Sequence, residues 1–185
     1  MKRPLQIVLI ALVAVGAATA GYLTNRATAP QPPAAAGVAP DAGRSLLALS
    51  LPDLAGTPQS LAQWQGKVLV VNFWATWCAP CRKEIPDFAA VSQRLAGDPV
   101  QFVGLSIDSA EKVRAFHKEF AVPYPLLVGT PDTLRVAAEL GNKAQALPFT
   151  VILDRGGRIA HVKLGTLKAD ELEGRIRALL PPRNG

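Results

Sequence analysis

Residues 67–74 form an almost unbroken run of β-branched and aromatic side chains, Lys-Val-Leu-Val-Val-Asn-Phe-Trp. Such a run is typical of a strand that is covered on both faces, as in the parallel sheets of α/β proteins. Two cysteines follow at once, in the segment Trp77-Cys78-Ala79-Pro80-Cys81. A helix is predicted from Cys78 to about Leu95, ended by Gly97-Asp98-Pro99. The cysteine pair is therefore expected where a buried strand gives way to a helix.

The chain from about residue 44 onward predicts a mixed α/β domain. Further strands are expected at about residues 100–107, 126–128, 149–153 and 158–164, the last two joined by a hairpin turn at 154–157. Further helices are expected at about residues 109–120, 132–140 and 168–180. Ser109 is expected to cap the first of these helices. The alternation favours a central sheet with parallel strands, to which the hairpin adds antiparallel ones.

A shorter pair of elements is predicted ahead of the long strand. Residues 46–51 and the turn at 53–57 predict a β-hairpin, and Ser60 is expected to cap a brief helix that ends at Trp64.

The first 23 residues predict a segment that enters a membrane. Lys2 and Arg3 precede an uncharged, mostly apolar stretch over residues 5–23. At about 1.5 Å per residue, a helix of this length spans roughly the hydrocarbon core of a bilayer. The stretch is either an uncleaved anchor, with Tyr22 at the far interface, or a signal peptide cleaved at Ala18-Thr19-Ala20. The basic flank favours export of everything that follows.

Residues 24–44 are predicted to form a linker rich in alanine and proline. The stretch 27–42 contains four prolines and almost no large apolar side chains. Such a stretch buries too little surface to offset the entropy of ordering it. Residues 45–185 are then expected to form the single globular domain.

The charge of the chain does not indicate a nucleic-acid partner. The formal net charge is +6, but part of it lies ahead of the predicted domain, at Lys2, Arg3, Arg26 and Arg44. The remaining basic residues form no stripe interleaved with aromatic side chains, so binding to nucleic acid is not expected.

The predicted position of Cys78 at a helix N-terminus favours its thiolate. Free backbone N–H groups and the helix dipole stabilise an anion there, and Arg82 is expected to add positive charge nearby. Cys81 lies about one turn further in and is expected to be more buried. The pair thus offers an attacking thiolate and a resolving thiol, which predicts thiol–disulfide exchange through a Cys78–Cys81 redox disulfide.

Other roles for the two cysteines are weaker. A structural zinc site usually needs four ligands, and only Cys78, Cys81, His117 and His161 are available, with the histidines on separate predicted elements. A purely structural disulfide would close a very short loop and add little stability. The main alternative is a metallochaperone that holds Cu(I) between the thiolates, although Met1 is the only methionine and no histidine flanks the motif. No cofactor and no resident metal is predicted.

The sequence from Asn72 to Pro86 resembles the active-site segment of the TlpA/ResA-like membrane-anchored thioredoxins: Asn-Phe-Trp-Ala-Thr-Trp-Cys-Ala-Pro-Cys-Arg-Lys-Glu-Ile-Pro. The resemblance extends over roughly residues 45–180. It implies a thioredoxin fold, with a central mixed sheet flanked by helices, an extra strand and helix between about residues 100 and 121, and an N-terminal β-hairpin. It also implies a periplasmic thiol–disulfide oxidoreductase.

The resemblance implies roles for residues beyond the cysteines. Pro148 matches a cis-proline that lies beside the active-site disulfide, where the Leu147 backbone would pair with an extended substrate segment. Glu84 matches an acidic residue that tunes the cysteines, on the Cys81 side of the helix. Asn72 stands where ordinary thioredoxins carry a buried Asp, and because Asn does not titrate, proton transfer would pass to Glu84 or to water.

The residues next to the cysteines are expected to contact the substrate. Trp77, Ala79 and Pro80 are predicted to shape that contact surface. Trp74 is expected either to shield the disulfide or to belong to the core, and Pro86 matches a proline that kinks the active-site helix.

The expected direction of electron flow follows from the residues between the cysteines. Strongly oxidising relatives place a histidine there, whereas Ala79-Pro80 offers neither charge nor side-chain hydrogen bonds. We therefore expect a reductant of disulfides in exported proteins, re-reduced by a thiol electron donor in the membrane. The resemblance makes apocytochrome c or a copper-centre assembly protein the expected client. It places the domain in the periplasm, held by one N-terminal anchor in the bacterial inner membrane or, after cleavage, soluble.

Overall fold

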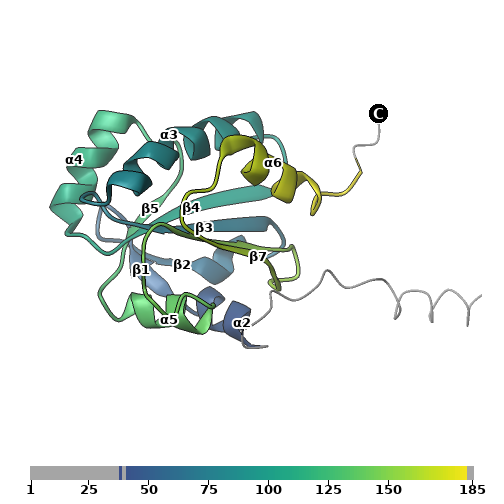
Figure 1. Ribbon diagram of the computed structural model, residues 1–185, viewed down its shortest axis with the longest axis horizontal. Coiled ribbons are helices and arrows are strands. Elements are labelled where there is room, and N and C mark those ends of the chain that lie inside the picture. Colours follow the sequence, from purple (N-terminus) through teal and green to yellow (C-terminus); the bar gives the residue numbers. More distant parts are fainter. Residues whose placement is uncertain (1–37, 39–40, 183–185) are drawn as a thin grey trace, which may run out of the picture. The chain divides into compact units, whose positions relative to one another are not determined.

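A five-stranded sheet in the order β5-β4-β3-β6-β7 forms the centre of the computed structural model, which describes residues 38 and 41–182 (Figure 1). The predicted membrane segment at residues 1–23 and most of the predicted linker lie outside these residues. Among the residues described, no helix combines the length and hydrophobicity that crossing a bilayer requires.

The sheet is mixed, as predicted. Its strands are β3 (Val68–Trp74), β4 (Val100–Ser106), β5 (Leu126–Val128), β6 (Phe149–Leu153) and β7 (Ile159–Leu164). The first three run parallel to one another, whereas β6 is antiparallel to both β3 and β7. Every residue of β3 is buried, which confirms the prediction of a central strand covered on both faces.

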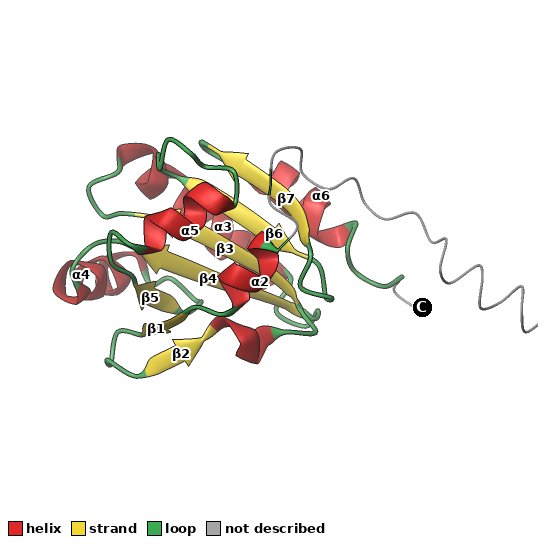
Figure 2. Cartoon of the chain, turned by 90° about the horizontal axis from the view of Figure 1, so that it is seen from below, coloured by secondary structure: helices red, strands yellow, loops and turns green. Residues whose placement is uncertain are grey.

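Helices cover both faces of the sheet (Figures 1 and 2). One face carries α3 (Ala79–Arg94), α4 (Ala110–Phe120) and α6 (Ala169–Arg177). The other carries α2 (Ala42–Leu47), the short 3₁₀ helix η1 (Leu61–Trp64) and α5 (Thr133–Glu139). This arrangement confirms the predicted thioredoxin fold, including the strand and helix expected between residues 100 and 121.

The alternation of side chains along β3 divides the core into two layers. Val70 and Trp74 pack with α3 and α4 on one face, and Val71 and Phe73 pack on the opposite face. Asn72 is the one polar residue of β3 and is 2% exposed. By the same alternation it faces α3, the helix that carries the cysteines.

The N-terminal boundary of the domain differs from the expectation. Residues 42–44 were expected to belong to the linker and residues 46–51 to a strand, but residues 42–47 form α2. Ala42 and Leu46 are spaced by one helical turn and are both buried in the second layer, so burial on one helix face overrides the strand-like pattern. The hairpin itself is present, shortened to β1 (Ser50–Pro52) and β2 (Pro58–Ser60).

Two predicted helix caps have different outcomes. The Ser109 hydroxyl accepts a hydrogen bond from the Lys112 backbone N–H at 3.4 Å, which confirms the cap of α4. Ser60 does occupy the N-cap position of η1, but its hydroxyl makes no capping hydrogen bond.

Candidate active site

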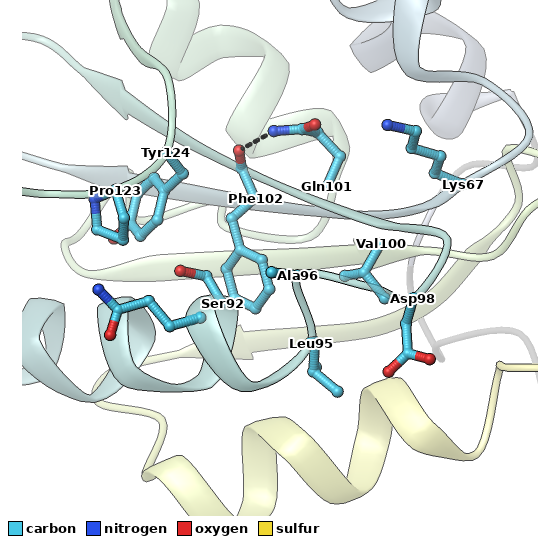
Figure 3. Close-up of a pocket in the computed structure, with 11 residues that line it drawn as sticks. Lys67, Ser92, Leu95, Ala96, Asp98, Val100, Gln101, Phe102, Pro123 and Tyr124 are labelled. Atoms are coloured by element: carbon cyan, nitrogen blue, oxygen red, sulfur yellow. Dashed lines mark hydrogen bonds between the residues drawn. The ribbon is translucent and has the colours of Figure 1, made fainter.

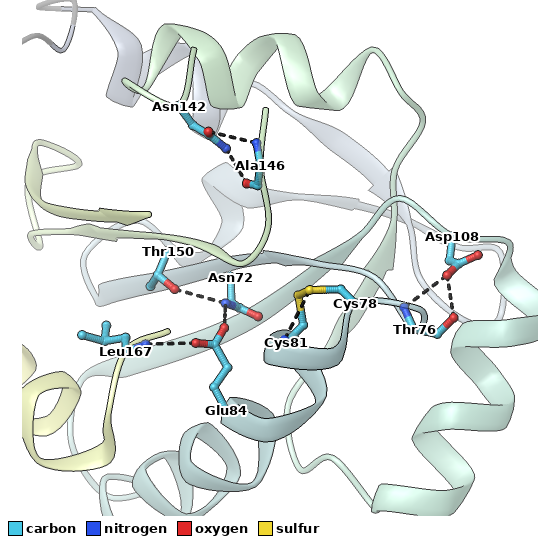
Figure 4. The surroundings of a disulfide bond; sticks show 10 residues. All are labelled: Asn72, Thr76, Cys78, Cys81, Glu84, Asp108, Asn142, Ala146, Thr150 and Leu167. Carbon is cyan, nitrogen blue, oxygen red and sulfur yellow. Dashed lines mark hydrogen bonds between the residues drawn. A yellow bond between two sulfur atoms is a disulfide. The ribbon is translucent and has the colours of Figure 1, made fainter. Parts of the chain in front are cut away.

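The two cysteines lie at the junction of β3 and α3, as predicted, and are joined by a disulfide (Figure 4). Cys78 is the N-cap residue of α3, and its Sγ atom accepts a hydrogen bond from the Cys81 backbone N–H at 3.3 Å. Cys78 is 5% exposed and Cys81 is fully buried. The sulfur of Cys78 therefore sits where the unpaired N–H groups of the helix point, with Cys81 behind it.

The surface next to Cys78 is apolar. Trp77 is 66% exposed, one of the most exposed large apolar side chains described, and Ala79 and Pro80 are exposed beside it. Leu147 is half-buried and Pro148 is buried. The peptide bond between these two residues is cis, as expected from the family resemblance.

Glu84 lies one helical turn beyond Cys81 and is only 1% exposed. Its carboxylate accepts hydrogen bonds from Asn72 Nδ2 at 2.8 Å and from the Leu167 backbone N–H at 3.0 Å (Figure 4). Burial raises the pKa of Glu84 to about 7, although both hydrogen bonds act in the opposite direction. Glu84 is thus a buried group that exchanges a proton near neutral pH.

Asn72 connects Glu84 to the neighbouring strand. Its Nδ2 also lies 3.1 Å from the Thr150 hydroxyl, and these two residues face each other in the β3–β6 register. The Asn72 Oδ1 atom is buried and has no hydrogen-bond partner. Neither Thr150 nor the Leu167 backbone is predicted from the sequence. For Thr150 the available signal was a single polar residue within each of two buried strands.

A second polar contact holds the loop ahead of Cys78. Asp108 Oδ2 accepts hydrogen bonds from the Thr76 backbone N–H at 3.1 Å and from the Thr76 hydroxyl at 2.6 Å. Burial raises the pKa of Asp108, but these bonds and the charge of Lys112 together lower it below its usual value. This contact is not predicted from the sequence either, although an acidic residue two positions after a parallel strand next to β3 was a usable signal.

Arg82 connects the first turn of α3 to α4. Its guanidinium group lies 5.3 Å from the ring centroid of Phe116 and 5.1 Å from that of Phe120, and 3.7 Å from the Glu119 carboxylate. These contacts hold the guanidinium group against α4 by cation–π interactions. The effect of its charge on Cys78 stays a prediction.

The structure also places four other residues that the sequence singles out. Trp74 is 1% exposed and packs on Phe116, with ring centroids 4.6 Å apart, so it belongs to the core. Pro86 lies inside α3. His117 and His161 lie on α4 and β7, and within residues 41–182 no three potential metal ligands come together.

The cavity in Figure 3 is separate from the cysteines. It has a volume of about 260 Å³ and is lined by residues from the C-terminal end of α3, among them Ser92, by Tyr124 and by the start of β4. No residue of the disulfide site lines this cavity.

Comparison with known proteins assigns this fold and site to a family. The sequence model of the Redoxin family matches residues 36–178. The chain belongs to the Redoxin family. A thioredoxin-like protein of Bacillus subtilis, YneN, is 35% identical over 131 residues, 69% of this chain and 74% of YneN. The thiol-disulfide oxidoreductase ResA of Geobacillus kaustophilus is 26% identical over 185 residues, 98% of this chain and 100% of ResA.

Solved structures of the same kind share the fold. A DsbF homologue from Corynebacterium diphtheriae has a TM-score of 0.64 and 34% identity, covering 71% of this chain and 83% of the homologue. Together with the bonded cysteine pair, these relatives identify this Redoxin family member as a thiol–disulfide oxidoreductase.

Proposed function

We propose that this oxidoreductase reduces disulfides in exported proteins, with Cys78 as the attacking residue and Cys81 as the resolving residue. The observation that carries the proposal is the asymmetry of the pair. Cys78 sits at the start of α3 beside the exposed Trp77, whereas Cys81 is fully buried one turn further in. A client disulfide approaching from solvent meets the sulfur of Cys78 first.

The reaction then proceeds in two exchanges. The Cys78 thiolate attacks one sulfur of the client disulfide, a mixed disulfide forms, and the first client thiolate leaves. Cys81 loses its proton and attacks the Cys78 sulfur, so the Cys78–Cys81 bond forms and the second client thiolate leaves. Two electrons pass to the client. The proton released by Cys81 passes through a buried acceptor to solvent, and the two client thiolates take up two protons from solvent. A thiol donor must then return two electrons and two protons to the pair.

Glu84 is the group proposed to accept the proton of Cys81. It lies on the next turn of the same helix, is buried, and has a pKa of about 7. Asn72 hydrogen-bonds Glu84 but does not titrate, so it orients the carboxylate without competing for the proton.

The proposed direction rests on how weakly the reduced Cys78 thiolate would be stabilised. Its sulfur has one backbone donor, the Cys81 N–H, and Ala79 and Pro80 add no side-chain donor. The Arg82 guanidinium lies against α4. A weakly stabilised thiolate favours the oxidised form of the pair, which lowers the reduction potential and makes the dithiol a reductant.

The client class follows from the same surface and from the family resemblance. Trp77, Ala79 and Pro80 present an apolar contact suited to an unfolded or extended segment around a disulfide. Apocytochrome c and copper-centre assembly proteins are such clients. The basic and apolar residues 2–23 support a periplasmic location, with a thiol electron donor in the inner membrane and either an anchored or a cleaved N-terminus.

Trapping tests both the nucleophile and the clients. The full chain carrying Cys81→Ser, expressed in bacterial membranes, should accumulate mixed disulfides through Cys78 that a reducing agent releases. Mass spectrometry of the released partners identifies them. The matched variant Cys78→Ser should capture almost nothing. Capture by Cys78→Ser at the level of Cys81→Ser would show that the two roles are reversed.

A further inference from the structure

The loop that carries the chain from β3 into α3 is held by a residue from another element. Asp108 lies just after β4, and its Oδ2 atom accepts both the backbone N–H and the hydroxyl of Thr76, at 3.1 and 2.6 Å (Figure 4). Thr76 is two residues ahead of Cys78. Figure 4 shows Asp108 and Thr76 on the Cys78 side of the disulfide, opposite the Glu84 group.

Asp108 is itself fixed from two directions. Its backbone N–H donates to the Ser106 hydroxyl at 3.2 Å, and Lys112 Nζ on α4 lies 3.5 Å from its other carboxylate oxygen, Oδ1. Its side chain is 7% exposed. The connection between β4 and α4 is thus a rigid support for the loop, because charge-assisted hydrogen bonds in a poorly hydrated place are strong.

The position of the loop decides where the Cys78 sulfur lies. The Cys78 backbone N–H donates to the Ala75 carbonyl at 3.1 Å, so Thr76 lies within the turn that sets the direction of Cys78. The Sγ atom is 3.3 Å from the Cys81 backbone nitrogen. Since hydrogen bonds weaken steeply with misalignment, a small shift of this turn reduces the stabilisation of a thiolate at Cys78.

We propose that Asp108 is a positioning residue for thiol–disulfide exchange: by holding Thr76 it fixes the Cys78 sulfur against the first turn of α3 and so sets the fraction of Cys78 that is thiolate. This inference rests on the proposed role of Cys78 as the attacking residue. The inference adds the β4–α4 connection to the active site.

The negative charge of Asp108 and its positioning of Thr76 would change the pKa of Cys78 in opposite directions, which makes the proposal testable. A negative charge near Cys78 disfavours its thiolate, so loss of charge alone lowers the pKa of Cys78. Loss of the contact that positions Thr76 raises the pKa of Cys78. Asp108→Asn removes the charge but keeps an acceptor oxygen for Thr76, whereas Asp108→Ala removes both.

The experiment measures the pH dependence of Cys78 alkylation by iodoacetamide in the reduced full chain, assigned to Cys78 by peptide mapping. Turnover with insulin as disulfide substrate is measured in parallel. We expect Asp108→Ala to raise the apparent pKa of Cys78 and to slow alkylation at pH 7 by threefold or more. Asp108→Asn should leave the apparent pKa of Cys78 unchanged or slightly lower it. Glu111→Gln, which removes the charge of an exposed carboxylate in the first turn of α4, is the matched control and should behave like the unaltered chain.

Thr76 provides a second test should Asp108→Ala fail to fold. Thr76→Val removes the hydroxyl donor and should raise the apparent pKa of Cys78 by a smaller amount than Asp108→Ala, whereas Thr76→Ser should restore it. If Asp108→Asn and Asp108→Ala lower that pKa equally, Asp108 acts through its charge and not by positioning Thr76, and the proposal is overturned. No change in Asp108→Ala or Thr76→Val would also overturn the proposal. If Cys78 of the unaltered chain is not alkylated ahead of Cys81, the proposed function itself fails, a separate outcome.

Discussion

Two single residues near the disulfide, Glu84 and Trp77, differ sharply in exposure to solvent. Glu84 is enclosed, and two donors do not fully compensate the loss of water around its carboxylate. Trp77 projects into solvent beside the disulfide. Glu84 is therefore expected to affect proton transfer, and Trp77 is expected to affect contact with client proteins.

Glu84 makes the stability of the domain depend on pH. Its pKa is raised from 4.5 to about 7 in the folded state, so the folded state holds this proton more tightly than the unfolded state. The corresponding stability is fully present below pH 4.5 and is lost as the pH rises through 7. For one group with such a shift the loss is on the order of 3 kcal/mol.

The variant Glu84→Gln should remove this dependence. A Gln amide has one acceptor oxygen and does not titrate, so it resembles the protonated carboxyl. We expect the free energy of unfolding of the unaltered, oxidised chain to fall between pH 4 and pH 8 relative to that of Glu84→Gln. Urea unfolding of both proteins across this range measures the difference. Parallel pH profiles would contradict a raised pKa for Glu84.

Trp77→Ala should separate client contact from chemistry. Because Trp77 is exposed, we expect its loss to change the free energy of unfolding by no more than about 0.5 kcal/mol. Reduction of insulin should slow several-fold, while reduction of glutathione disulfide, too small to use the apolar surface, should be nearly unchanged. Equal slowing with both substrates would show that Trp77 affects the exchange step at the cysteines and not only the contact with clients.

At the scale of elements, α4 is the support for the first turn of α3. Trp74, Phe116 and Phe120 form a continuous aromatic cluster. The rings of Trp74 and Phe116 are tilted, with centroids 4.6 Å apart, and those of Phe116 and Phe120 are stacked at 4.2 Å. The Arg82 guanidinium group lies over the two phenylalanine rings. Packing of α4 against the sheet therefore bears directly on the cysteine-bearing helix.

Phe116→Ala is expected to destabilise the chain strongly. Phe116 is 3% exposed, and a buried Phe truncated to Ala typically costs about 3–5 kcal/mol through lost contacts and the cavity left behind. Phe120 is half-buried at the end of the same helix, so Phe120→Ala serves as the control and should cost less than half as much. Urea unfolding at pH 7 compares the two, and equal losses would show that α4 is not anchored through Phe116.

The elements also show which parts of the structure the sequence could predict. The strand at 68–74 and the helix that carries Cys78 and Cys81 were predictable because an unbroken apolar run and a following cysteine pair are local signals. Helix α2 was not, because the leucines at 47, 49 and 51 alternate as in a strand across its C-terminal end, and only the packing of Ala42 and Leu46 decides in favour of a helix. The contacts of Glu84 with Asn72 and Leu167 depend on how distant segments meet, which no local pattern contains.

At the scale of the whole molecule, the site lies where four segments converge on the end of β3. The start of α3 supplies the cysteines, the β4–α4 connection supplies Asp108, and the segment around Leu147 borders β6. The loop before α6 reaches Glu84 through Leu167. Electron transfer by this molecule thus depends on the relative positions of α3, the β4–α4 connection, the segment before β6 and the loop between β7 and α6.

The reduction potential of the Cys78–Cys81 pair tests the central claim most directly. The full chain is equilibrated in glutathione buffers of known ratio, and the dithiol and disulfide forms are quantified by mass after alkylation. We expect a single two-electron transition at a potential below about −200 mV, as for reducing members of this fold. A midpoint near the roughly −120 mV of strongly oxidising members, or no transition between dithiol and internal disulfide, would contradict the account.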